Sequence, residues 1–221
     1  MRLKNLYSQA KHQVPNLYIL KLLVASMSGL VKELRGKTGA GILDCQNALK
    51  ETDSDIEKAV DLLRQKGLAA AQKKAGRETK EGVISSYIHA GSKIGVLVEI
   101  NCETDFVARN DEFQSLVKDV ALQIAAANPV YIQRENVSAE IIEREKSVYL
   151  GQAKEMGKPE AAWDKIVQGK LEKFYQEQCL IEQSFIKDPN STIKQILTEK
   201  IAKLGENISI ARFTRYQLGQ E

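Results

Sequence analysis

Residues 83–124 decide the fold, and they read VISSYIHAGSKIGVLVEINCETDFVARNDEFQSLVKDVALQI. Two runs rich in β-branched residues, Val83–His89 and Ile94–Asn101, are joined by Ala90-Gly91-Ser92-Lys93, and this pattern predicts a β-hairpin. After the hairpin, apolar residues recur at helical spacing until Asn128-Pro129 ends the run. They are Phe113, Leu116, Val117, Val120, Ala121 and Ile124.

The segments after this stretch add helices and a last strand. Helices are expected in Ser138–Met156, Pro159–Cys179 and Ser191–Leu204, where Gly205 follows as a cap. The strand-like stretch Ile208–Leu218 closes the chain and is expected to join the hairpin in one antiparallel sheet. Helices and strands segregated in this order indicate an α+β fold.

Three short helices are expected before the hairpin, in Ser28–Gly67. The third has a capping-box pattern, with Ser54 followed by Glu57, and Gly67 offers a stop. So small a unit buries little apolar surface. We therefore expect a module that presents one apolar face to a partner.

Four parts are expected along the chain: a basic extension or targeting segment in residues 1–27, a three-helix module in 28–67, a helical linker in 68–80, and an α+β core in 81–221. The linker is rich in lysine and alanine. It is either a solvated helical connector or a basic contact to RNA or to an acidic protein surface.

The first residues have a distinct composition, because Met1–Lys32 contains no acidic residue. Its apolar stretch, Leu17–Ala25, is interrupted by Lys21 and is far shorter than the about 20 residues that a membrane span needs. An organellar transit peptide, a secretory signal and an extension upstream of the real start all remain open, with Met27 as a candidate initiator. Basic, acid-poor character favours a transit peptide or an extension.

The composition limits the function. The chain has 221 residues, of which 43% are hydrophobic, which is enough for one sizeable domain and a small satellite. A net charge of +3 is slight, whereas a dedicated nucleic-acid binder usually has a much stronger basic excess. We expect neither direct nucleic-acid binding nor a membrane anchor.

Reactive groups are few. Cys45, Cys102 and Cys179 are widely separated and form no CxxC pair, so we interpret them as small core residues in a reducing compartment. His12 and His89 have no motif partner, and His89 is expected to be a satisfied surface or core histidine. The sequence thus predicts no catalytic residue, metal site or cofactor of its own.

The triplet Gly36-Lys37-Thr38 resembles the end of a phosphate-binding loop. That loop requires a glycine where Val31 stands, and it follows a strand, whereas a helix is expected here. We infer that the chain does not bind a nucleotide by itself. Any action on a nucleotide then runs through a partner.

The segment TDFVARN, Thr104–Asn110, joins a predicted strand to a predicted helix. Thr104 is a candidate helix cap, and Asp105 lies in the first turn, where a carboxylate is favoured. Phe106 is open to two interpretations. It is either a core residue or, because it falls off the stripe begun by Phe113 and has charged neighbours, an interface anchor.

Several segments together resemble the elongation factor Ts family. They are VKELRGKTGAGILDCQNALKE (Val31–Glu51), EINCETDFVARN (Glu99–Asn110), FIKDPNSTIKQIL (Phe185–Leu197) and IAKLGENISIARFTRYQLG (Ile201–Gly219). The resemblance implies a three-helix module similar to ubiquitin-associated domains, followed by an α+β core with an antiparallel sheet. It also implies a guanine-nucleotide exchange factor of translation whose partner is the GTPase elongation factor Tu.

The resemblance assigns roles to residues of both parts. It implies that Thr104, Asp105, Phe106 and Val107 disturb the Mg²⁺ site of the partner's GDP complex, with the phenylalanine as a wedge, and so promote exchange of GDP for GTP. On the three-helix module, Arg35, Ile42 and Leu43 match positions that face the GTPase. We also assign Arg109 and Asn110 to the partner contact.

The chain resembles the short members of the family. Between Met156 and Cys179 we expect no room for a second core repeat or a coiled-coil insertion, so a homodimer is a reasonable hypothesis. The expected compartment is the bacterial cytoplasm or an organelle, and the lysine-, isoleucine- and glutamine-rich composition favours a plastid stroma over a mitochondrial matrix. The rival functions are a binding adaptor for ubiquitin-like or nascent chains, which leaves TDFVARN without a purpose, and an RNA-binding protein, which lacks aromatic residues beside its lysines.

Overall fold

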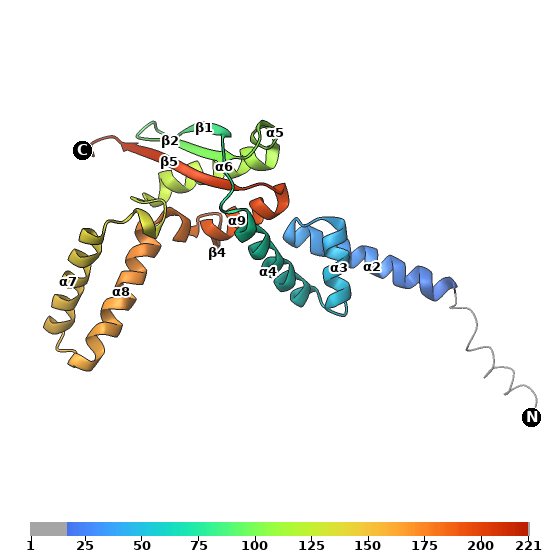
Figure 1. Ribbon diagram of the computed structural model, residues 1–221, viewed down its shortest axis with the longest axis horizontal. Coiled ribbons are helices and arrows are strands. Elements are labelled where there is room, and N and C mark those ends of the chain that lie inside the picture. The colour runs from blue at the N-terminus through green and yellow to red at the C-terminus, as the bar shows by residue number, and fades with distance from the viewer. Residues whose placement is uncertain (1–16, 221) are drawn as a thin grey trace, which may run out of the picture. The chain divides into compact units, whose positions relative to one another are not determined.

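The computed structural model describes residues 17–220, with side chains from Met27 onward. His12 and residues 1–16 of the expected basic extension lie outside this range. The chain divides into two compact units at the boundary between Gly67 and Leu68. Helices and an antiparallel sheet are both present (Figure 1), which confirms the predicted α+β fold.

The amino-terminal unit is built from α2 (Leu17–Thr38), α3 (Ile42–Glu51) and the first part of α4 (Ile56–Lys74). Helical spacing of small and aliphatic residues gives these helices a shared core of Val31, Leu34, Cys45, Ala48, Leu49 and Ala59. The first helix was expected from Ser28, but α2 begins at Leu17. Part of the segment assigned to a separate extension is therefore helical.

Two predictions about α4 were wrong. The residue that caps it is Asp55, whose Oδ1 accepts a hydrogen bond of 3.1 Å from the backbone N–H of Lys58. Ser54 cannot act as the cap because its φ of 66° is left-handed, whereas a capping residue is extended. Gly67 does not end the helix, which runs on to Lys74 because the alanines that follow are strong helix formers.

The sheet of the second unit has the order β1-β2-β5 and is antiparallel throughout. Strands β1 (Glu81–Ile88) and β2 (Ile94–Cys102) form the predicted hairpin, and β5 (Ile208–Gln217) is the predicted returning strand. One face of each strand is apolar because side chains alternate along it. The inner face of the central strand presents Val96, Val98 and Ile100, all buried.

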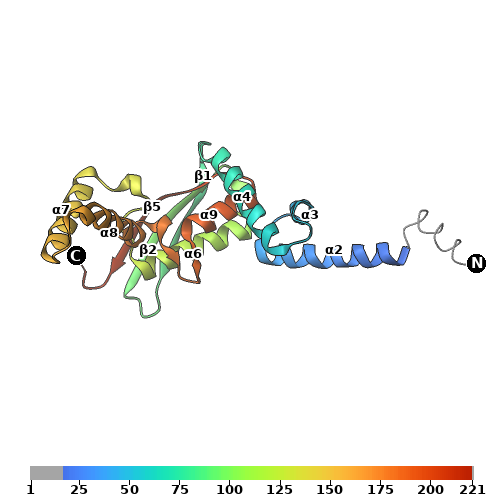
Figure 2. The ribbon, with the colours of Figure 1, turned by 90° about the horizontal axis from the view of Figure 1, so that it is seen from below.

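Helix α6 (Asp111–Ala127) covers this inner face together with α9 (Ile193–Leu204), as the two views of the ribbon show (Figures 1 and 2). The whole predicted stripe of α6 is buried in the main core: Phe113, Leu116, Val117, Val120, Ala121 and Ile124. The helix ends at Asn128, which is left-handed with a φ of 49°, directly before Pro129. Thr192 and Gln195 form a capping box at the start of α9.

A short hairpin, β3 (Ser184–Phe185) and β4 (Asp188–Thr192), was not predicted. It is fixed by Gln123, a fully buried amide on α6. Its Nε2 donates to the carbonyl oxygen of Ser184 at 3.1 Å, and its Oε1 accepts from the N–H of Ile186 at 2.9 Å. A single residue of α6 thus supplies hydrogen bonds to the backbone of a hairpin whose strands make few hydrogen bonds with each other.

Helices α7 (Ala139–Glu155) and α8 (Trp163–Gln178) pair as a helical hairpin that leads away from the sheet (Figure 1). Short 3-10 turns flank it at Arg134–Asn136 and Leu180–Glu182, and a third, Glu160–Ala162, lies in the connection between its two helices. Arg134 pairs with Glu172 and Glu182, and its guanidinium lies 4.5 Å from the centre of the Tyr175 ring. The two helices confirm those expected in Ser138–Met156 and Pro159–Cys179.

Gly82 on β1 is the glycine that the fold requires most strictly. Its φ is +149°, and a Cβ there would lie 2.3 Å from the carbonyl oxygen of Ile100 on β2. We predict that Gly82→Ala destabilises the protein by at least about 2 kcal/mol in urea unfolding. Gly151→Ala is the matched control, because Gly151 is helical with open space around it, and it should stabilise by about 0.5–1 kcal/mol. Equal effects of the two changes would contradict this account.

Glu112, in the first turn of α6, joins that helix to α9. Hydrogen bonds from Lys200 and Lys203 hold its pKa at about 2, below the ordinary 4.5. Because the folded-state pKa of Glu112 is lowered, its bonds to the two lysines stabilise the fold above pH 4.5, and this contribution is lost as the pH falls toward 2. We predict that Glu112→Gln flattens the fall in unfolding free energy across this window, whereas Glu155→Gln on the hairpin leaves its slope unchanged. Parallel curves for wild type and Glu112→Gln would refute the assignment.

Candidate functional site

The segment TDFVARN forms a tight connection between sheet and helix, because only eight residues separate the end of β2 from the start of α6. A single short helix, α5 (Asp105–Ala108), fits in this space. Thr104 is its cap, as predicted, and the side-chain oxygen accepts a hydrogen bond of 3.4 Å from the N–H of Val107. Asp105 lies in the first turn and pairs with Arg109 one turn later. We call residues 104–107 the tip.

Phe106 is displayed on the surface of the tip, with 81% of its area exposed. The residues after it turn the other way: Val107 packs at the edge of the main core, and Ala108 is buried. Because successive side chains of a helix point about 100° apart, a turn that buries Val107 and Ala108 directs Phe106 outward. Of the two interpretations of Phe106, the structure therefore excludes the core residue.

Two side chains hold the backbone of α5 and of its cap in place. The thiol of Cys102 donates to the carbonyl oxygen of Thr104 at 3.2 Å, and the amide of Gln114 donates to the carbonyl oxygen of Ala108 at 2.6 Å. Burial raises the pKa of the Cys102 thiol to about 11, so the sulfur keeps the proton that it donates. The bond from Gln114 satisfies a carbonyl oxygen at the end of the short helix, and the bond from Cys102 adds to the one that the carbonyl oxygen of Thr104 accepts from the N–H of Ala108 at 3.1 Å.

A second set of bonds joins the tip to the turn between α9 and β5. The carboxylate of Glu206 accepts from the N–H groups of Glu103 and Thr104, at 3.1 and 3.0 Å, and from the hydroxyl of Thr104 at 2.6 Å. In return the carboxylate of Glu103 accepts from the N–H of Asn207 at 2.6 Å. We call this reciprocal arrangement the clasp. Sequence reasoning missed it, because nothing in either segment links residues so far apart in the chain.

The residues assigned on the amino-terminal module belong to the other unit. Arg35 on α2 is exposed, and Ile42 and Leu43 at the start of α3 are 51% and 72% exposed. The module thus presents two apolar side chains of α3 and a cation of α2 to solvent. Gly36, Lys37 and Thr38 form the last turn of α2, not a loop after a strand.

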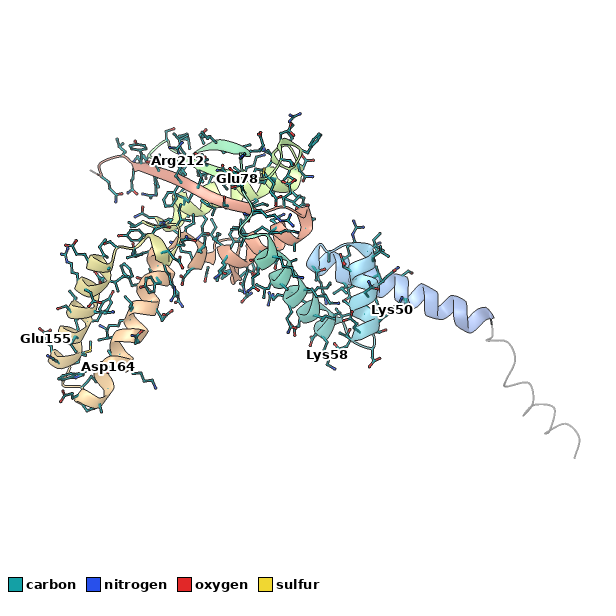
Figure 3. All side chains as sticks on the ribbon, in the orientation of Figure 1. Lys50, Lys58, Glu78, Glu155, Asp164 and Arg212 are labelled. Carbon is teal, nitrogen blue, oxygen red and sulfur yellow. The ribbon has the colours of Figure 1, made fainter. Side chains whose placement is uncertain are left out.

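The outer face of the sheet is a further apolar surface. Ile84, Ile88, Leu97 and Tyr216 are 68%, 62%, 48% and 71% exposed on it. Arg212, labelled on this face in Figure 3, donates to the carboxylate of Glu99 at 2.7 Å. We call these six residues the outer face. In the second unit they lie on the side of the sheet opposite to the buried residues of β2, which pack in the main core with α6.

The remaining candidates for chemistry have structural roles. All three cysteines are buried and unpaired, as predicted, and burial raises the pKa of Cys179 to about 11 as well. His89 is exposed, with Nδ1 3.0 Å from the Tyr87 hydroxyl. In the described part of the chain, no group of His, Cys, Asp and Glu is arranged to hold a metal ion. Of the helices drawn from Leu17 onward, none has both the length and the apolarity to cross a bilayer.

Comparison with known proteins places the chain in a family. The family model described as elongation factor TS matches residues 46–220. The elongation factor Ts of Geobacter sulfurreducens is 60% identical over 190 residues, which cover 86% of this chain and 88% of that protein. The elongation factor Ts of Carboxydothermus hydrogenoformans is 60% identical over 193 residues, covering 87% and 89%. That of Thermodesulfovibrio yellowstonii is 59% identical over 197 residues, covering 89% and 98%.

These relatives are bacterial proteins, and they give no support to the preference for a plastid. The match runs through the tip, the clasp and the sheet, so it covers every feature of the second unit described above. The chain belongs to the elongation factor Ts family of translation elongation factors.

Proposed function

We propose that the protein is a guanine-nucleotide exchange factor that binds the GDP complex of elongation factor Tu and promotes replacement of GDP by GTP. The observation that carries this proposal is the exposure of Phe106, whose aromatic side chain is 81% exposed. The turn that bears it is fixed before and after Phe106, because Glu206 accepts from the N–H of Thr104 and Gln114 donates to the carbonyl oxygen of Ala108. A large apolar group held rigidly in water, with charged neighbours, has the properties of an interface anchor. Family membership supplies the partner.

The mechanism needs no reactive group in this chain. A GTPase holds GDP through loop amides, a lysine and a bridging Mg²⁺, and the ion offsets the charge of the phosphates. Phe106 enters the GTPase as a wedge, and the neighbouring Asp105 displaces groups that hold the ion. Loss of Mg²⁺ leaves the phosphates exposed to repulsion and water, so GDP leaves.

Differential binding accounts for the rate without covalent catalysis. The factor binds the empty GTPase better than the GDP complex, and by reciprocity it weakens GDP by the same factor. Each tenfold gain in release rate needs only about 1.4 kcal/mol, whereas one buried aromatic anchor contributes about 2–4 kcal/mol. The wedge is therefore large enough to matter. The protein acts as an exchange factor on its partner and not as an enzyme.

The amino-terminal module adds a second contact in this proposal. Residues 28–67 serve as the partner-binding module, with Arg35, Ile42 and Leu43 toward the GTPase, while residues 81–221 form the core that carries the tip. Arg109 and Asn110 extend the contact beyond the tip. Supporting this, Ile42 and Leu43 are more than half exposed in a module whose other apolar residues make its core. We propose the bacterial cytoplasm as the compartment, since the relatives are bacterial.

The proposal is tested by the release of fluorescent GDP from elongation factor Tu, with and without this protein. Wild type should accelerate release. Phe106→Ala should lower the acceleration by about 30-fold or more, because truncating a central aromatic anchor costs about 2–4 kcal/mol. Its thermal unfolding midpoint should stay near that of wild type, because 81% of the area of Phe106 is exposed in the fold.

Phe113→Ala provides the control for the fold, because that ring is fully buried and its loss should destabilise by about 3–5 kcal/mol. If wild type does not accelerate release, the proposed function is wrong. If Phe106→Ala unfolds as readily as Phe113→Ala, Phe106 is a structural residue.

We also propose that two copies of the chain associate through the outer face. Its exposed aliphatic and aromatic side chains form a surface that a monomer rarely leaves uncovered. A two-fold interface places the same patch on both subunits, so apolar residues meet apolar residues. Glu99 and Arg212 lie side by side on this face, so each copy offers both charges and can exchange ion-pair partners with its neighbour.

Light scattering should therefore give the mass of two chains for wild type, and the mass of one chain for Leu97→Glu at the same concentration. Val148→Glu is the matched control, because Val148 on the helical hairpin is 46% exposed against 48% for Leu97. A mass of one chain for wild type at working concentration rejects the dimer. Dissociation by Val148→Glu as well would move the interface away from the outer face.

A further inference from the structure

We propose that Glu206 is a positioning residue for nucleotide exchange: its carboxylate fixes the direction in which Phe106 is displayed. This inference rests on the proposed function and names a residue outside the tip on which that function depends. Glu206 lies at the start of the turn that follows α9, half-buried, directly after the left-handed cap Gly205. Both carboxylate oxygens are directed at the tip.

Each oxygen of the Glu206 carboxylate has its own hydrogen-bond partners. Oε2 accepts from two successive backbone N–H groups, those of Glu103 and Thr104, at 3.1 and 3.0 Å. These are the last free donors before α5 begins. A carboxylate that accepts two adjacent amides fixes the peptide plane between them, and charge-assisted bonds of this kind are stronger than neutral ones.

Glu206 also binds the hydroxyl of Thr104. Its only proton is donated to Oε1 of Glu206 at 2.6 Å, so a lone pair is left for the N–H of Val107 at 3.4 Å. Glu206 thus orients the residue that caps the helix bearing Phe106. The cap bond by itself is long, and without the carboxylate the hydroxyl is free to rotate away from it.

The other two polar side chains of the clasp, those of Glu103 and Asn207, already have partners of their own. The carboxylate of Glu103 is already bonded to the N–H of Asn207 at 2.6 Å and lies 3.5 Å from the Arg77 guanidinium. The side-chain amide of Asn207 is bonded to the carbonyl oxygen of Arg77 at 2.8 Å. Without Glu206, the two amides at the base of the tip have no side-chain acceptor from the clasp, and they must open toward water.

The position of Phe106 determines the rate of GDP release in this proposal. A wedge acts only when it enters its partner at the correct angle, and a small misplacement of a group that acts in the transition state lowers the rate strongly. The remaining contact surface still allows the GTPase to bind. Loss of Glu206 should therefore lower the rate of GDP release at saturation and leave the half-saturating concentration nearly unchanged.

The test measures GDP release from elongation factor Tu against the concentration of the full-length protein. Glu206→Ala should lower the saturating rate about tenfold or more, with the half-saturating concentration within about twofold of wild type. Glu206→Gln keeps one oxygen for the two amides but loses the acceptor for the Thr104 hydroxyl, so its rate should fall between the two. Glu155→Ala, at the far end of α7 (Figure 3), is the control and should behave as wild type.

A double-mutant cycle separates positioning from other roles. If Glu206 acts through Phe106, adding Glu206→Ala to Phe106→Ala should cause no further loss. A full additional tenfold loss would show that Glu206 acts elsewhere, and a wild-type rate for Glu206→Ala would overturn the inference.

Amide exchange followed by NMR supplies a readout that is independent of the GTPase. The N–H groups of Glu103 and Thr104 should exchange much faster in Glu206→Ala, while that of Ile100 in β2 should stay protected. Unchanged exchange at both amides would overturn the inference whether or not the protein promotes nucleotide exchange. If wild type fails to release GDP but the amides respond as expected, the proposed function fails and the positioning of the tip stands.

Discussion

The burial of one helix face against one strand is the interaction on which the structure of the second unit depends. Helix α6 places its apolar stripe on the inner face of the sheet, where β2 is the central strand. Because α6 follows β2 so closely in sequence, this packing fixes both ends of the connection. The connection has too few residues to adopt many conformations, and it folds as a capped helical turn. The exposed position of Phe106 is thus a consequence of core packing elsewhere.

The tip is a short turn that is held rigidly by its neighbours. Its most prominent feature is the exposed aromatic side chain of Phe106, carried on a turn whose backbone is fixed. Rigidity comes from bonds that reach it from three elements: Cys102 at the end of β2, Gln114 on α6, and Glu206 after α9. An apolar side chain on a mobile loop loses ordering entropy when it binds, whereas one on such a turn has already lost it in folding. Such an arrangement lowers the entropy cost of any contact that the exposed Phe106 ring makes.

Much of this was predictable from sequence, because periodicity is a local property. The hairpin, the stripe of α6, the returning strand and the Thr104 cap all follow from residues close together in the chain. The errors also have physical causes. Ser54 matched a capping pattern, but its backbone is left-handed, and Gly67 was outweighed by the alanines after it. The β3–β4 hairpin depends on a buried amide of α6, and no local pattern reports such a contact.

The candidate site divides in the same way. The tip was predictable as a segment, and the exposure of Phe106 was one of two interpretations until the structure showed its direction. The clasp was not predictable, because Glu103 and Asn207 are 104 positions apart. This separation also sets a timetable for synthesis. A growing chain on the ribosome contains the residues of the tip when only about half of it has been made, but Glu206, one of their three supports, lies in the last part to emerge. An unfinished chain can thus hold this turn through Cys102 and Gln114, and the bonds from Glu206 form only after the turn that follows α9 has been made.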